Sequence, residues 1–308
     1  MIRRALLSLV PIALAACAAQ PAESSPPSPA KPVAAAPTAL LPPVPQPPER
    51  PLAPASVTDP AIPEAQRREA FVAWATKAFG VDPDVVRAGL AQAVFKQNII
   101  DAMTRPAEAV KPWRDYRPIF LTQKRIDGGR AFYAAHRADL DRIAAQTGVP
   151  AEMIVAIIGV ETMYGGNTGK YRALDALSTL AFGYPKRAPF FAAELAQLFA
   201  LAKEEGFDPA APTGSYAGAV GWGQFMPSSW RNWGRDGDGD GRRDLVADPD
   251  DVFASIANYF VAHGWQRGAP VAGRADKVAG RPDFLPPDPK ALDPVYPLAF
   301  LEGKGYRL

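Results

Sequence analysis

Apolar residues recur every three or four positions along residues 62–308, which is the spacing of amphipathic helices, and strand-like alternation is nearly absent. The pattern predicts one helix over residues 64–79, which Gly80 ends, and another opened by Asp82-Pro83. Further helices are predicted over residues 125–147, 171–180, 190–205 and a stretch that ends at His263-Gly264. The proline-bounded segment 111–118 is predicted to be a loop, in which Tyr116 either faces a cleft or packs. The chain is therefore predicted to be mainly α.

One carboxylate lies on the apolar face of a predicted helix that begins at Pro150 and stops at Gly165-Gly166. Glu161 shares that face with three isoleucines at helical spacing, Ile154, Ile157 and Ile158. Burial and the negative end of the helix dipole both disfavour the charged form, so both raise the pKa of Glu161. A carboxyl that keeps its proton near neutral pH can act as a general acid. The alternative is a buried glutamate held by an arginine for structural reasons.

Residues 215–230 form a second informative stretch, in which three glycines let the backbone approach a ligand closely: Gly218, Gly221 and Gly223. Hydroxyl, amide and aromatic groups surround them, on Ser215, Tyr216, Trp222 and Gln224. Sugars are bound by such a mixture, because their flat apolar faces pack on aromatic rings and their hydroxyls pair with amides and hydroxyls. A tight turn with packed aromatic rings is the alternative interpretation.

An aspartate-rich loop follows. Positions 1, 3 and 5 of an EF-hand-like loop are occupied by Asp236, Asp238 and Asp240. Gly241 follows at position 6, and Arg242 would offer its backbone carbonyl at position 7. Position 12 is Ala247 instead of glutamate, so a later carboxylate has to close the site: Asp248, Asp250 or Asp251. Asp251 is included among the candidate ligands. The loop predicts structural calcium with no part in chemistry; a solvated acidic turn is the alternative.

The first residues have the pattern of a bacterial targeting segment. Arg3-Arg4 precede a short apolar run that is too short to span a bilayer. The segment ends at Cys17, preceded by small residues, and is similar to a lipobox; the interpretation is a lipoprotein signal over residues 1–17, with lipidation at Cys17. The alternative is an ordinary secretory signal. Residues 18–61 are rich in proline and alanine and predict an extended, disordered tether.

Composition narrows the remaining possibilities. The 308 residues are 48% hydrophobic and carry a net charge of +2, without the basic block that a nucleic-acid partner requires. The two histidines, His136 and His263, lie far apart in the sequence and argue against a metal-ligand pair or a histidine-based triad. A single cysteine excludes an intramolecular disulfide.

Four motifs together resemble the lytic murein transglycosylase B family over about residues 65–266: Glu161-Thr-Met-Tyr-Gly-Gly, the stretch from Ser215 to Ser229, the aspartate-rich loop and Ser255-Ile-Ala-Asn-Tyr. The resemblance implies a mainly α, lysozyme-like α+β core with an EF-hand-like calcium loop. It implies cleavage of the β-1,4 bond between N-acetylmuramic acid and N-acetylglucosamine, with formation of a 1,6-anhydro ring. Glu161 matches the family's single catalytic acid/base. Tyr116, Ser215, Gln224 and Tyr259 match residues that line its sugar cleft.

The resemblance also implies where the protein works. We expect a catalytic domain over residues 62–308, monomeric, needing no cofactor for catalysis, with peptidoglycan strands as partner and no nucleic acid. The lipid at Cys17 would hold it in the periplasm, at the outer membrane because Ala18 replaces the aspartate that marks inner-membrane retention. The family continues beyond the position of Leu308, so we expect a shortened C-terminal segment. Two alternatives stay open: a non-catalytic murein-binding lipoprotein and a calcium-dependent scaffold module.

Overall fold

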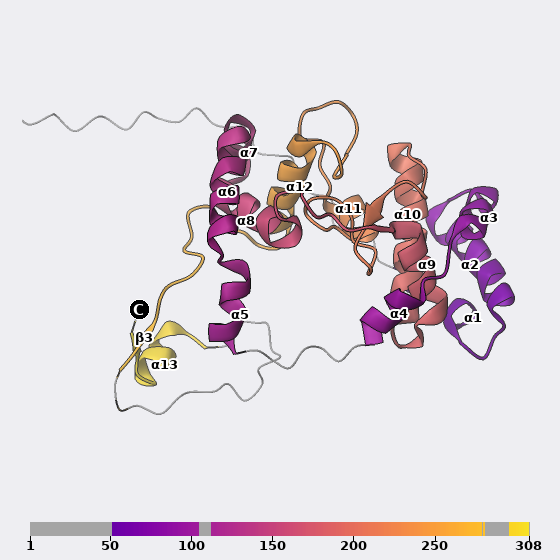
Figure 1. Cartoon of the computed structure of the whole chain (residues 1–308), viewed down its shortest axis with the longest axis horizontal. Helices are drawn as coiled ribbons and strands as arrows, with labels where there is room; N and C mark the ends of the chain where they lie inside the picture. Colours follow the sequence, from indigo (N-terminus) through magenta and orange to yellow (C-terminus); the bar gives the residue numbers. More distant parts are fainter. Residues whose placement is uncertain (1–50, 105–111, 279, 281–295, 308) are drawn as a thin grey trace, which may run out of the picture. The chain divides into compact units, whose positions relative to one another are not determined.

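The computed structural model of the chain describes residues 51–104, 112–278, 280 and 296–307. Two apolar helices, α9 (Ala173–Gly183) and α10 (Ala188–Glu205), pack along each other and form the core beside the N-terminal helices (Figure 1). Both are buried on nearly all sides, as expected for helices that are apolar all round. Helices α2 (Glu64–Phe79) and α11 (Pro227–Trp233) pack on α10, so the central helix organises both ends of the core.

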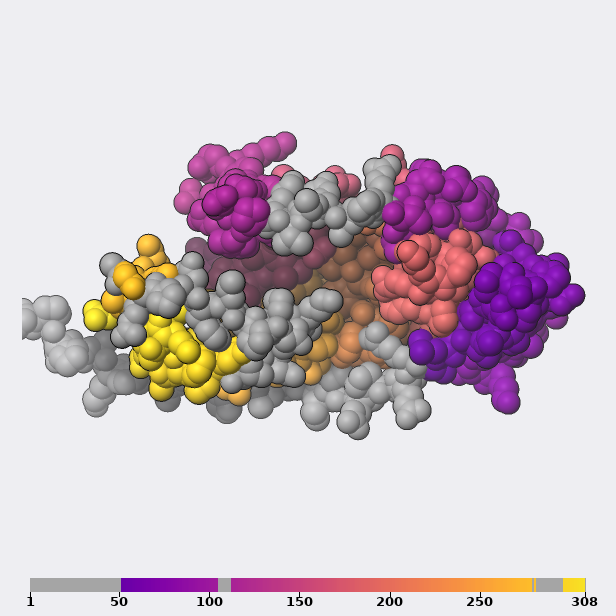
Figure 2. Space-filling model, turned by 90° about the horizontal axis from the view of Figure 1, so that it is seen from below, coloured from indigo at the N-terminus to yellow at the C-terminus, as the bar shows by residue number. Residues whose placement is uncertain are grey.

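The N-terminal helices cover one side of this pair, where their indigo residues lie against α9 and α10 (Figure 2). Helix α3 (Pro83–Gln92) begins as predicted, because the Asp82 carboxylate accepts the backbone N–H of Asp84 at 2.8 Å. Helix α4 (Gln97–Thr104) was not predicted and packs on α9. Helix α1 (Ala55–Thr58) corrects the predicted end of the tether at residue 61: Val57 is fully buried, so the fold begins before that boundary.

A second group of helices surrounds α8 (Ala151–Thr162): α6 (Gln123–Ala135), α7 (Arg137–Thr147) and α12 (Pro249–Ala262). The single helix predicted over residues 125–147 is wrong, because the chain leaves helical geometry at His136 (φ −114°, ψ 21°). The His136 ring lies 4.6 Å from that of Phe132 and 5.5 Å from that of Phe253, centre to centre. The contact with Phe253, which is distant in the sequence, supports the break, and apolar spacing does not reveal it.

The predicted loop over residues 111–118 is also wrong where the structure describes it. Residues Trp113–Phe120 form helix α5, with Pro118 inside it. Pro112 acts at the N-terminus of α5, where its carbonyl accepts the N–H groups of Asp115 (2.9 Å) and Tyr116 (3.1 Å). Pro112 therefore precedes a helix of eight residues and Pro118 lies within it, whereas the sequence pattern treats both prolines as loop signals.

Short strands complete the described part. The antiparallel pair β1 (Tyr171–Arg172) and β2 (Thr213–Gly214) places Tyr171 opposite Gly214, and joins the start of α9 to the glycine-rich loop. The 3₁₀ turn η1 (Pro185–Arg187) links α9 to α10, and β3 (Asp276–Lys277) pairs with β4 (Tyr306–Arg307) beyond α13 (Leu298–Gly303). Among the described residues no single helix has the length and apolar composition to cross a bilayer; α7 and α8, bent by 116° at their junction, meet that test only as a pair.

Candidate active site

Glu161 stands in the last turn of α8, immediately before an unusual backbone. The helix ends at Thr162, before the predicted Gly165-Gly166 stop, because Met163 and Tyr164 already adopt positive φ (52° and 63°). A left-handed conformation costs a residue with a Cβ about 1–2 kcal/mol. In the described part of the chain, Gln224 (φ 50°) is the one other non-glycine residue of this kind. Such strain marks positions that the surrounding structure over-determines.

The side chain of Tyr164 shows what holds this backbone. Its hydroxyl donates to the carbonyl of Arg125 on α6 at 2.6 Å. Its ring fills a slot between α6 and α8 that three glycines leave open: a Cβ on Gly159 or Gly129 would lie 2.7 Å from the ring or its hydroxyl, and one on Gly128 at 2.9 Å. The Thr162 hydroxyl then donates to the carbonyl of Trp222 at 2.9 Å. The backbone turn that follows Glu161 is thereby tied to α6 through Tyr164 and to the glycine-rich loop through Thr162.

The Glu161 side chain opens into a cavity of about 630 Å³. Helix α8, the glycine-rich loop, α11 and the end of α12 form its walls. Apolar groups make up most of the lining; the complete set is Ile157, Glu161, Gly223, Gln224, Phe225, Met226, Ser229, Ile256, Tyr259, Phe260, His263, Gly264 and Trp265. Its size and composition are those of a small-molecule or sugar site.

The environment of Glu161 differs in one respect from the sequence-based prediction. Ile154 and Ile158 are buried, whereas Glu161 is exposed to the cavity together with the half-buried Ile157. The expected burial is therefore wrong, but desolvation by the cavity walls still raises the pKa of Glu161, as predicted. Among the described residues its carboxyl has no hydrogen-bond or ion-pair partner, so no arginine holds it.

Gln224 and Tyr259 share this cavity with Glu161. The Gln224 amide nitrogen donates to the carbonyls of Gly221 (3.0 Å) and Thr168 (3.1 Å), which orients its amide oxygen and stabilises its left-handed backbone. The Tyr259 ring is held edge-on by Trp233 at 5.0 Å between centroids, and remains 40% exposed. An oriented amide and a fixed aromatic ring suit a sugar ligand.

Two predicted substrate residues do not line the cavity. The Ser215 hydroxyl accepts the N–H of Ala219 at 3.1 Å within its own turn. Tyr116 lies on α5, 45% exposed, with its ring 5.1 Å from that of Phe120. Their roles remain predictions. Sequence reasoning missed Ser229, His263 and Trp265, although Ser229 belongs to the Met-Pro-Ser-Ser motif and the other two follow a predicted helix end.

The aspartate-rich loop gathers carboxylates. Oxygens of Asp236, Asp238 and Asp251 lie within 4.8 Å of one another. Asp251 is buried and accepts the N–H groups of Gly237 and Asp244, each at 2.6 Å. Burial first, and then the charges of Asp248 and Asp236, raise the pKa of Asp251 to about 6. Three converging carboxylates, one of them desolvated, fit a hard divalent cation.

The other candidate calcium ligands, Asp240, Asp248 and Asp250, make hydrogen bonds or ion pairs within the protein. Asp248 caps α12 by accepting the N–H of Asp250 at 2.8 Å, and Asp250 pairs with Arg142, so Asp251 is the closing carboxylate that remains. The Asp240 carboxylate accepts the N–H of Arg242 at 2.8 Å and lies outside the converging group. Ligation by Asp240 or by the Arg242 carbonyl remains a prediction.

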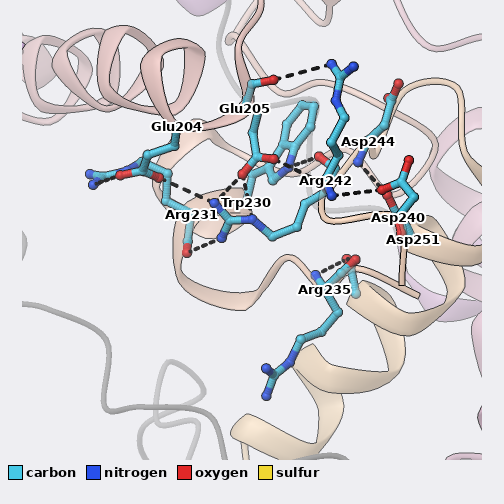
Figure 3. A network of polar contacts seen from close by, with 11 residues as sticks. Glu204, Glu205, Trp230, Arg231, Arg235, Asp240, Arg242, Asp244 and Asp251 are labelled. Carbon is cyan, nitrogen blue, oxygen red and sulfur yellow. Dashed lines mark hydrogen bonds and ion pairs between the residues drawn. The ribbon is translucent and has the colours of Figure 1, made fainter. Parts of the chain in front are cut away.

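A polar network anchors this loop to the central helix (Figure 3). Glu205, at the end of α10, accepts the backbone N–H of Arg243 at 2.9 Å and pairs with its guanidinium. The Trp230 indole N–H of α11 donates to the Arg243 carbonyl at 2.9 Å. Because Asp251 lies in the first turn of α12, which carries Tyr259, the loop connects the core to one wall of the cavity.

The family model described as the transglycosylase SLT domain matches residues 64–294. The chain belongs to this family. It is 41% identical over 226 residues, 70% of the chain, to the membrane-bound lytic murein transglycosylase B of Escherichia coli K12, and spans 62% of that protein's length. The transglycosylase match and the mainly helical structure confirm the predicted lysozyme-like fold class.

Solved structures of transglycosylases agree with this membership. The soluble lytic transglycosylase SltB1 from Pseudomonas aeruginosa superposes with a TM-score of 0.71 at 44% identity, covering 78% of this chain and 80% of the other. The Escherichia coli lytic transglycosylase Slt35 in complex with calcium superposes with a TM-score of 0.69 at 37% identity, covering 78% and 74%. The family recognised from the four sequence motifs is thereby confirmed.

Proposed function

We propose that this protein is a peptidoglycan lytic transglycosylase. It cleaves the β-1,4 bond between N-acetylmuramic acid and N-acetylglucosamine and forms a 1,6-anhydromuramic end, as a carbon–oxygen lyase acting in cell-wall turnover. The observation that carries the proposal is the Glu161 cavity: one carboxyl with a raised pKa, facing a sugar-sized cavity beside Gln224 and Tyr259. The activity that names its relatives supports the same reaction.

The single carboxyl decides which mechanism fits. Most glycosidases use a pair of carboxylates on either side of the bond, one as acid and one as base or nucleophile. Among the described residues that line the cavity, Glu161 is the one acid. Its raised pKa keeps the proton available, so Glu161 protonates the glycosidic oxygen as the C1–O bond breaks. The 2-acetamido group of the substrate stabilises the positive charge at C1, a substrate-assisted route.

The second half of the reaction returns the proton. Glu161, now ionised, takes the proton of the muramyl C6 hydroxyl while that oxygen closes on C1, so atoms balance without water. The half-buried Ile157 and the rings of Phe225 and Phe260 give the cavity that Glu161 lines an apolar wall, which is less favourable to water than a polar one. Gln224 and Tyr259 hold the sugar, and we assign Ser215 and Tyr116 to more distant contacts with the strand.

Calcium and location complete the proposal. Asp236, Asp238 and Asp251 would hold a structural calcium, with Asp240 and the Arg242 carbonyl as further ligands; the calcium complex of Slt35 supports this. Cys17 carries a lipid that anchors the monomeric protein in the periplasm, at the outer membrane, and the membrane-bound relative supports membrane attachment. Cys17 and most of the predicted tether lie outside the described residues.

Mass spectrometry of glycan fragments tests the reaction. Purified sacculi incubated with the protein are expected to release fragments with 1,6-anhydromuramic ends. Fragments one water heavier, with reducing ends, would identify a hydrolase and contradict the transglycosylase proposal. Protein that sediments with sacculi but releases nothing would instead support the non-catalytic murein-binding alternative.

A further inference from the structure

We propose that His263 is a substrate-binding residue, whose Nε2 atom accepts a hydrogen bond from a hydroxyl or acetamido N–H of the bound sugar. The inference rests on the proposed function, and adds to the cavity a residue that neither the motifs nor the relatives' names assign. His263 follows the end of α12 and lines the same cavity as Glu161, Gln224 and Tyr259.

The tautomer of His263 follows from its own helix. Its Nδ1 atom lies 2.7 Å from the backbone carbonyl of Tyr259. A carbonyl oxygen only accepts, so Nδ1 has to carry the hydrogen, and the Nε2 of the neutral ring is left with a lone pair. Among the described residues Nε2 has no partner. The ring is therefore a hydrogen-bond acceptor whose free atom belongs to a cavity-lining side chain.

The ring is also held in place before any ligand binds. It stacks on the Tyr259 ring at 4.0 Å between centroids and 25° between planes, and meets the Trp233 ring at 4.8 Å and 61°. With the bond to the Tyr259 carbonyl, these contacts restrain both side-chain torsions. Little conformational entropy is lost when such a group binds a sugar, which favours affinity.

A sugar bound in this cavity would need hydrogen-bond acceptors such as the His263 Nε2 atom. A sugar brings several O–H and N–H donors, and each donor taken from water without a partner costs free energy. Glu161 has to hold its proton as a donor, and the Gln224 nitrogen is occupied by two carbonyls. The Gln224 oxygen and the His263 Nε2 are acceptors whose orientation is held by hydrogen bonds on the same side chains. The hydroxyls of Ser229 and Tyr259 can also accept, and the rest of the walls is mainly apolar: Ile157, Phe225, Ile256 and Phe260.

Three substitutions of His263 separate the acceptor from the ring. Phenylalanine keeps the stack on Tyr259 and removes both nitrogens; asparagine places an amide near Nδ1; glutamine reaches the position of Nε2. We expect His263→Phe and His263→Asn to raise KM on soluble glycan strands about tenfold, the effect of one lost hydrogen bond, with kcat within about twofold. His263→Gln is expected to recover most of the loss.

The other histidine provides the matched control. His136 also packs on aromatic rings, those of Phe132, Trp222 and Phe253, but does not line the cavity. His136→Phe is expected to leave KM within about twofold. An unchanged KM in His263→Phe, or equal losses in all three His263 variants, would overturn the proposal, because either result removes the role of Nε2.

A binding measurement keeps this inference distinct from the proposed reaction. The affinity of an N-acetylglucosamine tetramer is measured by calorimetry in the Glu161→Gln background, where turnover is not required. A tenfold weaker affinity with His263→Phe supports the acceptor role even if wild-type protein releases no anhydro product. Equal affinities with and without His263→Phe contradict it even if wild-type protein is active.

Discussion

The position of Glu161 in the lining of a mainly apolar cavity raises the pKa of its carboxyl. Its pKa is raised because the cavity walls displace water from the carboxyl, and no neighbouring charge in the described structure compensates. Sequence spacing predicted that the pKa of Glu161 is raised, but attributed the increase to burial of the side chain in the core instead of to the cavity walls. Helical periodicity gives the face on which a side chain lies, and it does not tell whether packing closes over that face, as over Ile158, or leaves a cavity, as beside Glu161.

A polar group beside the carboxyl tests this cause. Ile157 precedes Glu161 by one turn and lines the same cavity, so Ile157→Asn is expected to let water solvate the carboxylate and lower the pKa of Glu161. In its proposed role as general acid, Glu161 then loses its proton at lower pH, and the alkaline limb of kcat/KM against pH is expected to move to lower pH. Ile157→Leu, which keeps the site apolar, is the control. An alkaline limb at the same pH in both variants would contradict desolvation as the cause.

At the scale of elements, the Tyr164 side chain connects helices α6 and α8. Tyr164 leaves α8 through a left-handed backbone, fills the glycine slot and bonds to α6, which fixes the turn after Glu161. The sequence predicted α2, α3, α9, α10 and α12 well, because their apolar spacing and terminal residues agree. It missed the break at His136 and the early end of α8, because ring contacts between distant segments hold both.

Filling the slot should damage both the packing and the activity. In an open helix Gly→Ala stabilises by about 0.5–1 kcal/mol, but a Cβ on Gly159 would lie 2.7 Å from the Tyr164 ring. Overpacking of this kind costs about 1–3 kcal/mol. We therefore expect Gly159→Ala to lower the free energy of unfolding and kcat together, measured by urea denaturation and by product release.

The control for this substitution is another helical glycine. Gly303 in α13 has no atom within 4 Å of the position a Cβ would take, so Gly303→Ala is expected to be neutral or slightly stabilising. If Gly159→Ala behaves like Gly303→Ala, the slot does not hold Tyr164 tightly and the account of the α8 terminus fails.

At the scale of the whole molecule, we expect the aspartate-rich loop to couple folding to pH and to the proposed calcium ion. The spacing of its aspartates predicted a calcium loop from the sequence, but the fold was needed to identify Asp251 as the carboxylate that closes it. Only the structure reveals that Asp248 caps a helix, that Asp250 pairs with Arg142 and that Asp251 is buried. The pKa of Asp251, about 6 against an ordinary 3.8, means that its ionisation opposes folding while no cation is bound.

The dependence of stability on pH should therefore differ with and without calcium. In EDTA, the contribution of Asp251 is present below the ordinary pKa and is lost as pH rises through about 6, so Tm falls over this range. Calcium at about 100 times its Kd stabilises by about 2.7 kcal/mol, roughly 5–10 °C in Tm. The gain grows with pH because ligands have to be ionised.

Two substitutions check the assignment by differential scanning calorimetry. Asp251→Asn is expected to remove most of the calcium-dependent gain, whereas Asp276→Asn, on the exposed strand β3 outside the loop, is expected to leave it intact. A Tm that does not respond to calcium between pH 5 and about 8 would contradict a cation site formed by these carboxylates.

The most direct test of Glu161 as the catalytic acid is the release of anhydromuropeptides from purified sacculi by Glu161→Gln, measured by mass spectrometry. Glu152→Gln, an exposed glutamate in the first turn of the same helix, is the matched control. The loss of the one general acid is expected to reduce release at least 100-fold, with Glu152→Gln close to wild type and both variants folded. Release by Glu161→Gln at the wild-type rate would contradict the assignment of the reaction to this carboxyl.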